Sequence, residues 1–144
     1  MIEAEWWEYD SLDELADAVA GDVGFIVDSA VDARNASLIA LPGGEEAAAI
    51  YAKLPARQLP WKRVTIIPTD ERLVPMDDER SNVRGIAKAF LPSGARVIPI
   101  AADIPDYALA GNSADARLQD LPWPPDLVWL GVGEDGHTAS IFAG

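Results

Sequence analysis

Hydrophobic residues follow two alternating patterns along this chain: helical spacing and short continuous runs. The aromatic-rich residues 4–10, AEWWEYD, predict a short strand. Ser11 and Glu14 then form a capping-box pattern before apolar residues at three- and four-residue spacing, which predicts a helix. The same spacing resumes after Gly21 and continues to about Arg34. The first quarter of the chain is therefore predicted to hold a strand and two helical stretches.

Beyond residue 36, short apolar runs alternate with helical patterns. This alternation predicts an α/β fold with a doubly wound, mostly parallel sheet and helices on both faces, in a Rossmann-like three-layer arrangement. The last run, DLVWLGV, is continuously apolar, as in a strand buried on both faces. Residues 1–144 carry no repeat or linker and are predicted to form a single domain. The expected strands are 37–41, 63–68, 95–100 and 126–132, and the expected helices are 45–54, 81–91 with Ser81 as N-cap, and a weaker one within 107–121.

Polar and glycine-rich stretches follow three of these predicted strands. They are LPGGEE at 41–46, PTDERLVP at 68–75 and GVGEDGH at 131–137. The carboxyl ends of parallel strands share one edge of the sheet, and ligands of such sheets bind there. We therefore expect the functional site to be built from these three stretches.

The sequence is strongly acidic, with a net charge of −13, which argues against nucleic acid as a partner because such binding depends on Lys and Arg. Nine of the eleven basic residues lie within 51–100. Two interpretations stay open: solvated helix faces, or a positive field at one site that receives a small anion. The lack of cysteine, of a basic leader and of a long apolar run predicts a soluble, cytoplasmic protein with no membrane partner.

Residues 131–136 match the dinucleotide-binding pattern G-x-G-x-x-G after a predicted strand. The full fingerprint also needs a following helix and an acidic residue about 20 positions further on, but the sequence given ends at Gly144. Glu134 and Asp135 also stand where a pyrophosphate approaches. We therefore expect no nicotinamide or flavin site, and we interpret the glycines as allowing a sharp turn.

His137, the only histidine of the chain, lies in this glycine-flanked turn. Asp135 can hold one ring nitrogen so that the other faces a substrate or water. A surface or structural histidine is the competing interpretation. The stretch contains no G-x-S-x-G pattern of a serine hydrolase, and one His with no Cys argues against a transition-metal site.

Asp70, Glu71 and Arg72 come directly after the predicted strand at 63–68, where a charged trio is hard to explain as core. One interpretation is a solvated loop with an internal ion pair. The other is that Arg72 recognises an anionic or hydroxylated ligand, because its guanidinium donors match phosphate oxygens.

Taken in order, the blocks LPGGEE, TDERLVPMDDERSN and LGVGEDGHTASIFAG resemble the 6-phosphogluconolactonase family, which is grouped with the glucosamine-6-phosphate deaminases. The resemblance spans nearly the whole chain. It implies a doubly wound α/β fold and hydrolysis of 6-phospho-glucono-1,5-lactone to 6-phosphogluconate in the pentose phosphate pathway. It also implies a sugar phosphate as the partner, with no metal or organic cofactor.

The resemblance implies roles for individual residues as well. His137 is expected to be the general base that activates water and then the acid that protonates the departing ring oxygen, while Asp135 orients it. The glycine turn is expected to offer backbone N–H groups to the substrate. The positions that the resemblance places at the substrate are Gly43, Gly44, Asp70, Arg72 and Asn82.

Two features depart from the family pattern. Glu45 and Glu46 follow the glycines where the family usually has a pair of hydroxyl residues. Carboxylates satisfy a helix dipole and repel a phosphate, so neither is expected to be a ligand. The sequence given also ends at Gly144, whereas the family continues through further strands and helices. We therefore expect the domain to be incomplete at its C-terminus and this 144-residue piece to have weak or no lactonase activity.

Two other functions stay open. One is a glucosamine-6-phosphate deaminase or isomerase, although that branch typically has Tyr where this chain has Arg72. The other is a truncated, non-catalytic module that binds sugar phosphate.

Overall fold

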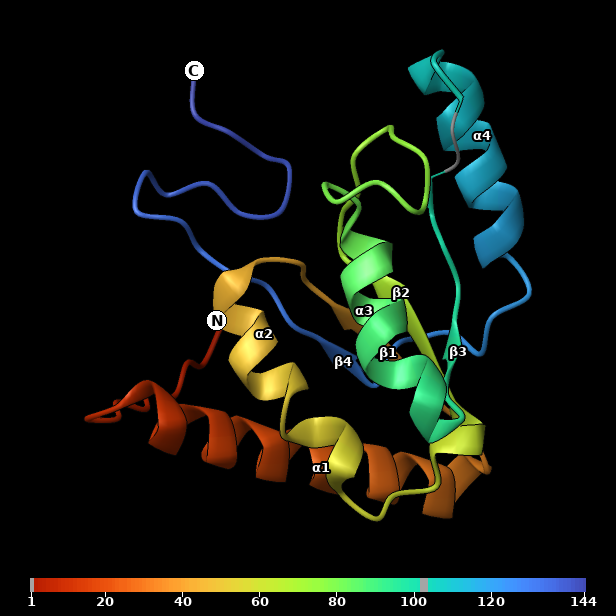
Figure 1. The fold of residues 1–144 in the computed structure, drawn as a ribbon. Helices are drawn as coiled ribbons and strands as arrows, with labels where there is room; N and C mark the ends of the chain where they lie inside the picture. The colour runs from red at the N-terminus through yellow and green to blue at the C-terminus, as the bar shows by residue number, and fades with distance from the viewer. Residues whose placement is uncertain (1, 102–103) are drawn as a thin grey trace.

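The computed structural model describes residues 2–101 and 104–144, which build a four-stranded parallel sheet (Figure 1). The strand order across the sheet is β3-β2-β1-β4. β1 pairs with β2 on one side and with β4 on the other, so the direction of winding reverses between β1 and β4. The strands are β1 (Ser37–Leu41), β2 (Val64–Pro68), β3 (Arg96–Val97) and β4 (Leu127–Val128).

Helices cover both faces of the sheet, as expected for the doubly wound class. Helices α1, α2 and α3 and the single-turn elements pack together on one face, and α4 lies apart from them on the other face (Figure 1). None of the described helices is long and apolar enough to cross a membrane. The helices are α1 (Leu12–Arg34), α2 (Glu45–Tyr51), α3 (Asn82–Phe90) and α4 (Tyr107–Leu118), with short 3-10 turns η1 (Leu54–Ala56), η2 (Trp61–Arg63) and η3 (Leu91–Ser93).

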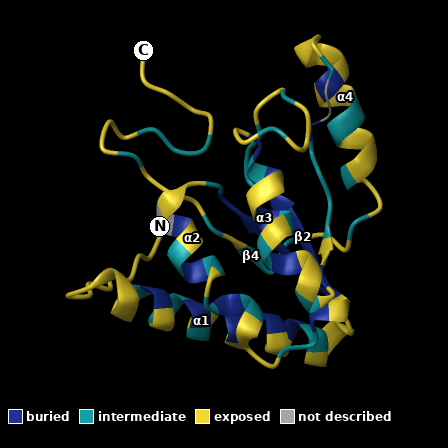
Figure 2. Cartoon of the chain, viewed as in Figure 1, coloured by how far each residue is buried: buried dark blue, intermediate teal, exposed yellow. Residues whose placement is uncertain are grey.

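Successive side chains of β1 and β2 point to opposite faces of the sheet, so the hydrophobic core is divided into two clusters. Ile39 pairs with Ile66, and both side chains point into the larger cluster with α1, α2 and α3. Leu38 and Ile67 point the other way, where Leu118 at the end of α4 packs on them. All five residues of β1 and of β2 are buried, which explains why these runs carry apolar residues without alternation (Figure 2).

α1 is one continuous helix rather than two stretches separated at Gly21. Ser11 Oγ accepts a hydrogen bond from the Glu14 backbone N–H at 3.1 Å, so the predicted N-cap is confirmed. The helix ends at Asn35, whose φ of 60° places it in the left-handed region. Gly24 is a point of close approach, because a Cβ there would lie 3.2 Å from Arg57 Nε.

Three expected strands differ from the structure. Residues 4–10 form no strand, and Trp6 is 89% exposed, so the strand prediction there was wrong. The run at 126–132 forms only the two-residue β4, and Val128 is half-exposed instead of buried on both faces. The run at 95–100 is likewise reduced to β3. A β-strand needs a neighbour to satisfy its backbone, and within the described residues these segments have a partner on one side or none.

Because β1 is buried and β4 is half-exposed, replacing a side chain by alanine should affect the free energy of unfolding differently in the two strands. Ile39→Ala removes a fully buried side chain and should lower the free energy of unfolding by about 2–5 kcal/mol. Val128→Ala, in the half-exposed β4, should change it by about 0.5 kcal/mol or less. Urea unfolding of both variants measures the difference, and equal losses would contradict this assignment of the core.

Candidate active site

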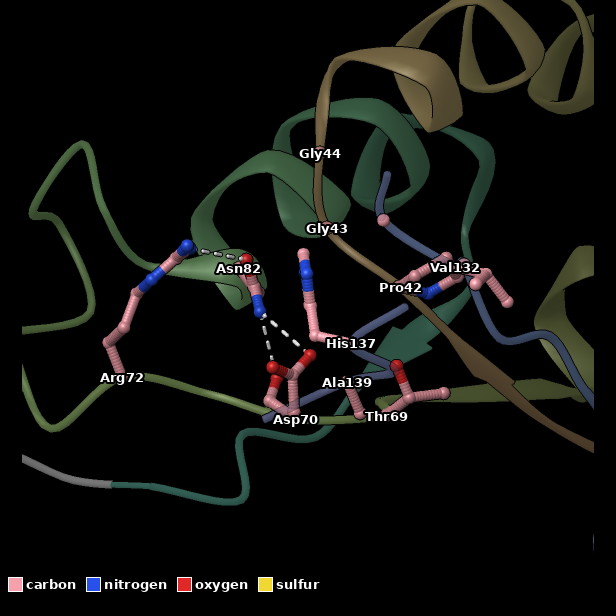
Figure 3. A pocket seen from close by; sticks show the side chains of 12 residues that line it. Pro42, Gly43, Gly44, Thr69, Asp70, Arg72, Asn82, Val132, His137 and Ala139 are labelled. Atoms are coloured by element: carbon pink, nitrogen blue, oxygen red, sulfur yellow. Dashed lines mark hydrogen bonds between the residues drawn. The ribbon is translucent and has the colours of Figure 1, made fainter. Parts of the chain in front are cut away.

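A cleft opens at the carboxyl edge of the sheet, where the winding reverses between β1 and β4. The segments that follow β1, β2 and β4 all contribute to it (Figure 3). This is the place where open α/β sheets bind their ligands. The cleft has a volume of about 410 Å³ and is lined by Pro42, Gly43, Gly44, Thr69, Asp70, Arg72, Asn82, Gly131, Val132, Gly133, His137 and Ala139.

The turn after β1 brings backbone close to the cleft. Gly44 is the N-cap of α2 with φ 109°, a conformation that glycine adopts without strain. Gly43 lies against Asn82, and a Cβ at this position would overlap the amide group. The Tyr51 hydroxyl donates a hydrogen bond to the Pro42 carbonyl and so ties α2 to the turn. Burial raises the pKa of Tyr51, so this hydroxyl keeps its proton.

Asp70, Glu71, Arg72 and Asn82, which follow β2, form a polar wall of the cleft with Asn82 at its centre. Its Nδ2 donates to the Asp70 carbonyl at 3.0 Å and to Asp70 Oδ1 at 3.2 Å. Its Oδ1 accepts a hydrogen bond from Arg72 Nη1 at 3.0 Å (Figure 3). The three predicted residues of this segment therefore form one connected group, with the guanidinium of Arg72 exposed at its outer end.

Glu71 organises this wall, although sequence reasoning did not select it as a site residue. Its carboxylate accepts hydrogen bonds from the backbone N–H groups of Asn82 at 2.7 Å and Val83 at 2.8 Å. It also accepts from Ser81 Oγ at 3.0 Å and from the Arg72 N–H at 2.9 Å. The Asn82 and Val83 N–H groups are otherwise unpaired donors of the first turn of α3, and a carboxylate there also favours the helix dipole.

His137 enters the cleft from the segment after β4, and its ring points toward the Gly43 turn in Figure 3. Its Nδ1 is hydrogen-bonded to the Asp135 carboxylate, which also accepts from the His137 backbone N–H at 3.1 Å. The ring stacks on Phe142 with centroids 5.1 Å apart. A Cβ on Gly133 would overlap the imidazole, so glycine is needed there for the ring to lie where it does.

The hydrogen bond from His137 lowers the pKa of Asp135, so this carboxylate stays ionised through the neutral range. An ionised carboxylate can only accept, which places the proton of the neutral imidazole on Nδ1. Nε2 then carries the lone pair. The arrangement can therefore take up a proton from a molecule in the cleft.

A family model described as glucosamine-6-phosphate isomerases/6-phosphogluconolactonase matches residues 10–144. The chain belongs to this family. Among curated relatives, the 6-phosphogluconolactonase of Rhizobium meliloti (strain 1021) is 40% identical over 90% of this chain and 57% of its own length. That of Mesorhizobium japonicum is 36% identical, over 95% of this chain and 59% of its own length.

Solved structures of the 6-phosphogluconolactonase family have the same fold. The crystal structure of the enzyme from Shewanella baltica OS155 matches with a TM-score of 0.88 at 29% identity, covering 92% of this chain and 58% of that one. The structure from Trypanosoma brucei matches at 0.81 and 27%, covering 96% and 63%. A monomeric glucosamine-6-phosphate deaminase shares the fold, with a TM-score of 0.77 at 18% identity. The chain thus spans less than two thirds of the length of the relatives it matches.

All seven residues that sequence reasoning assigned to a 6-phosphogluconolactonase site lie in or beside this cleft. Six of them line it. Asp135 does not, but it is hydrogen-bonded to the ring of His137, which does. Tyr51 and Glu71 were missed because their roles arise from contacts with backbone groups distant in the sequence. Within the described residues, no group of three or more His, Cys, Asp or Glu is placed to hold a metal ion.

Two of the nine basic residues of 51–100 form ion pairs within the described structure, and one lines the cleft. Lys53 bonds to Asp13 and Asp17 on α1. Arg80 pairs with Asp78 and lowers the pKa of that carboxyl to about 2. Arg72 is the basic residue among those that line the cleft. Arg72, Arg80, Arg84 and Lys88 also line a second hollow, which shares Gly43, Gly44 and Asn82 with the cleft. The anion-site interpretation is therefore not limited to Arg72.

Glu71 provides a test of how the polar wall is held. Glu71→Gln replaces one accepting oxygen with an NH2 group that faces N–H donors, so buried donors lose their partner. We expect the free energy of unfolding to fall by about 1–3 kcal/mol, measured by urea titration. Glu79→Gln is the matched control, because Glu79 is exposed and makes no side-chain hydrogen bond to any described residue. Equal stabilities for the two variants would show that Glu71 does not organise α3.

Proposed function

We propose that this chain carries the catalytic centre of a 6-phosphogluconolactonase, which hydrolyses 6-phospho-glucono-1,5-lactone to 6-phosphogluconate in the pentose phosphate pathway. The observation that carries the proposal is His137, held through Nδ1 by Asp135 with its ring in the cleft. A base positioned in this way needs neither a metal ion nor an organic cofactor to activate water. The family match and the names of the relatives support the same reaction.

The proposed reaction begins with a water molecule between His137 Nε2 and the lactone carbonyl carbon. Nε2 takes a proton from the water as its oxygen adds to that carbon. The tetrahedral intermediate then breaks the bond between the carbonyl carbon and the ring oxygen. The imidazolium returns its proton to the departing ring oxygen, which becomes the hydroxyl of the open-chain acid. Asp135 stabilises the imidazolium between the two transfers.

The substrate is proposed to lie between the Gly43–Gly44 turn and the polar wall. Arg72, the basic residue of the cleft lining, offers guanidinium donors to the phosphate or to hydroxyl groups. Asp70 and Asn82 face the sugar hydroxyls. The backbone N–H groups of Gly43 and Gly44 are proposed to contact the substrate and to stabilise the oxyanion that forms on the carbonyl.

We also propose that residues 1–144 form part of a domain whose β4 side is covered by further chain. Support comes from large apolar side chains that are half-exposed or more, both before α1 and from β4 onward. They are Ile2, Trp6, Trp7, Val128, Leu130, Val132, Ile141 and Phe142. A cytoplasmic location and the lack of a nucleic-acid partner stay predictions from composition.

The catalytic assignment is tested by His137→Ala in a form with lactonase activity. Loss of the general base should lower the rate of lactone hydrolysis by about 10²–10⁴-fold, measured with freshly prepared 6-phosphogluconolactone. Asp135→Asn should also lower it, because an amide cannot hold the same tautomer as a carboxylate does.

Glu134→Gln is the matched control for Asp135→Asn, because Glu134 is an exposed carboxylate in the same turn and bonds to none of the described residues. Its rate should equal that of the wild type. A near-normal rate in His137→Ala would refute the catalytic role. Release of ammonia from glucosamine 6-phosphate, with no lactone hydrolysis, would favour the deaminase alternative.

A second test compares this 144-residue chain with a longer form that has the length of the relatives. The longer form should hydrolyse the lactone, and the short chain should show weak activity or none, because the β4 side of its cleft is open to solvent. Calorimetry with 6-phosphogluconate separates loss of binding from loss of turnover. Robust turnover by the short chain would show that residues 1–144 suffice for catalysis.

A further inference from the structure

The segment that carries His137 is joined to the rest of the molecule through very few polar contacts. Trp129 N–H donates to the Ala40 carbonyl at 3.0 Å, next to β4. Beyond it, the recorded hydrogen bonds of residues 130–144 run within the segment, with one exception among the described residues. Ser140 Oγ donates to Asp70 Oδ2 at 2.7 Å and so bridges 70 positions of sequence.

The acceptor of this bond is itself fixed in place. Asp70 Oδ1 accepts from Asn82 Nδ2, and Asn82 is held by Glu71 at the start of α3. A chain of hydrogen bonds therefore runs from Ser140 through Asp70 and Asn82 to the first turn of a helix that packs in the core. Because the Asp70 carboxylate is charged, the bond from Ser140 belongs to the stronger, charge-assisted class.

The backbone next to Ser140 also needs to be held. Ala139 has a φ of 52°, in the left-handed region that residues with a Cβ seldom adopt. Such a conformation persists where surrounding contacts over-determine it. The paired backbone bonds between Thr138 and Ile141 fix it from one side, and the bond from Ser140 to Asp70 fixes it from the other.

We propose that Ser140 is a positioning residue for the reaction, which anchors the His137 segment to the strand end of β2 through Asp70. The inference rests on the proposed lactonase function. Ser140 does not line the cleft. Its effect on the reaction passes through the placement of the imidazole relative to a substrate bound at the polar wall. A displacement of a catalytic group by about 1 Å can lower a rate by about 10²-fold.

The test has a structural arm and a kinetic arm. Hydrogen exchange of the Thr138 and Ile141 amides, in the 144-residue chain without ligand, should be several-fold faster in Ser140→Ala. Ser140→Thr keeps the hydroxyl and should restore slow exchange. Thr138→Val is the matched control, because it removes a hydroxyl from the same segment that bonds to no described side chain.

The kinetic arm uses a form with lactonase activity. Ser140→Ala should lower kcat by about 10-fold or more and change KM by less than about threefold, since substrate contacts remain. Ser140→Thr should recover most of kcat, and Thr138→Val should retain it. In an Asp70→Ala background, Ser140→Ala should have no further effect on kcat, because its partner is already absent.

Unchanged exchange in Ser140→Ala would overturn the anchor. Faster exchange with a normal kcat, or additive losses with Asp70→Ala, would overturn the positioning role. If the wild-type form hydrolyses no lactone, the proposed function fails on its own, and the exchange arm still decides whether the anchor exists.

Discussion

The pairing of β1 with two parallel neighbours is the constraint on which the rest of the structure depends. Its five residues are buried, and its backbone is bonded to β2 and β4. Asp126 strengthens the β4 side, since its N–H donates to the Leu38 carbonyl at 2.7 Å and its carboxylate accepts from the Leu38 N–H at 2.9 Å. With the three strands parallel, the segments that follow them must leave at one edge, and the reversal of winding separates them enough to form a cleft.

Carboxylates organise this cleft more than cations do. Glu71 satisfies donors of α3, Asp70 joins two segments, and Asp135 orients the imidazole. Each of these carboxylates accepts hydrogen bonds from protein donors. Arg72 brings a positive charge to the cleft lining, and Glu45, which begins α2, brings a negative charge next to the Gly43–Gly44 turn.

The sequence predicted most of the fold where local and tertiary signals agree. Ser11 and Ser81 cap helices as expected, and β1 and β2 occupy the expected runs. Both features depend on a few consecutive residues, so the local sequence is enough to predict them. The strand predictions were wrong or too long at residues 4–10, 95–100 and 126–132, where apolar composition suits a strand but the described residues supply a partner on one side or none. Most site residues were predicted because they follow strands, and Asn82, which opens α3, was predicted through the family resemblance. Glu71 and Tyr51 were not, because their partners are backbone groups brought near by folding.

The position of His137 has a practical consequence. It is the single histidine among 144 residues, and its ring lies in the cleft against Phe142. Every imidazole resonance in a proton NMR spectrum of this chain therefore originates from one place. The His137 ring can therefore serve as a spectroscopic probe of protonation, ligand contact and exchange between conformations, without labelling or engineering.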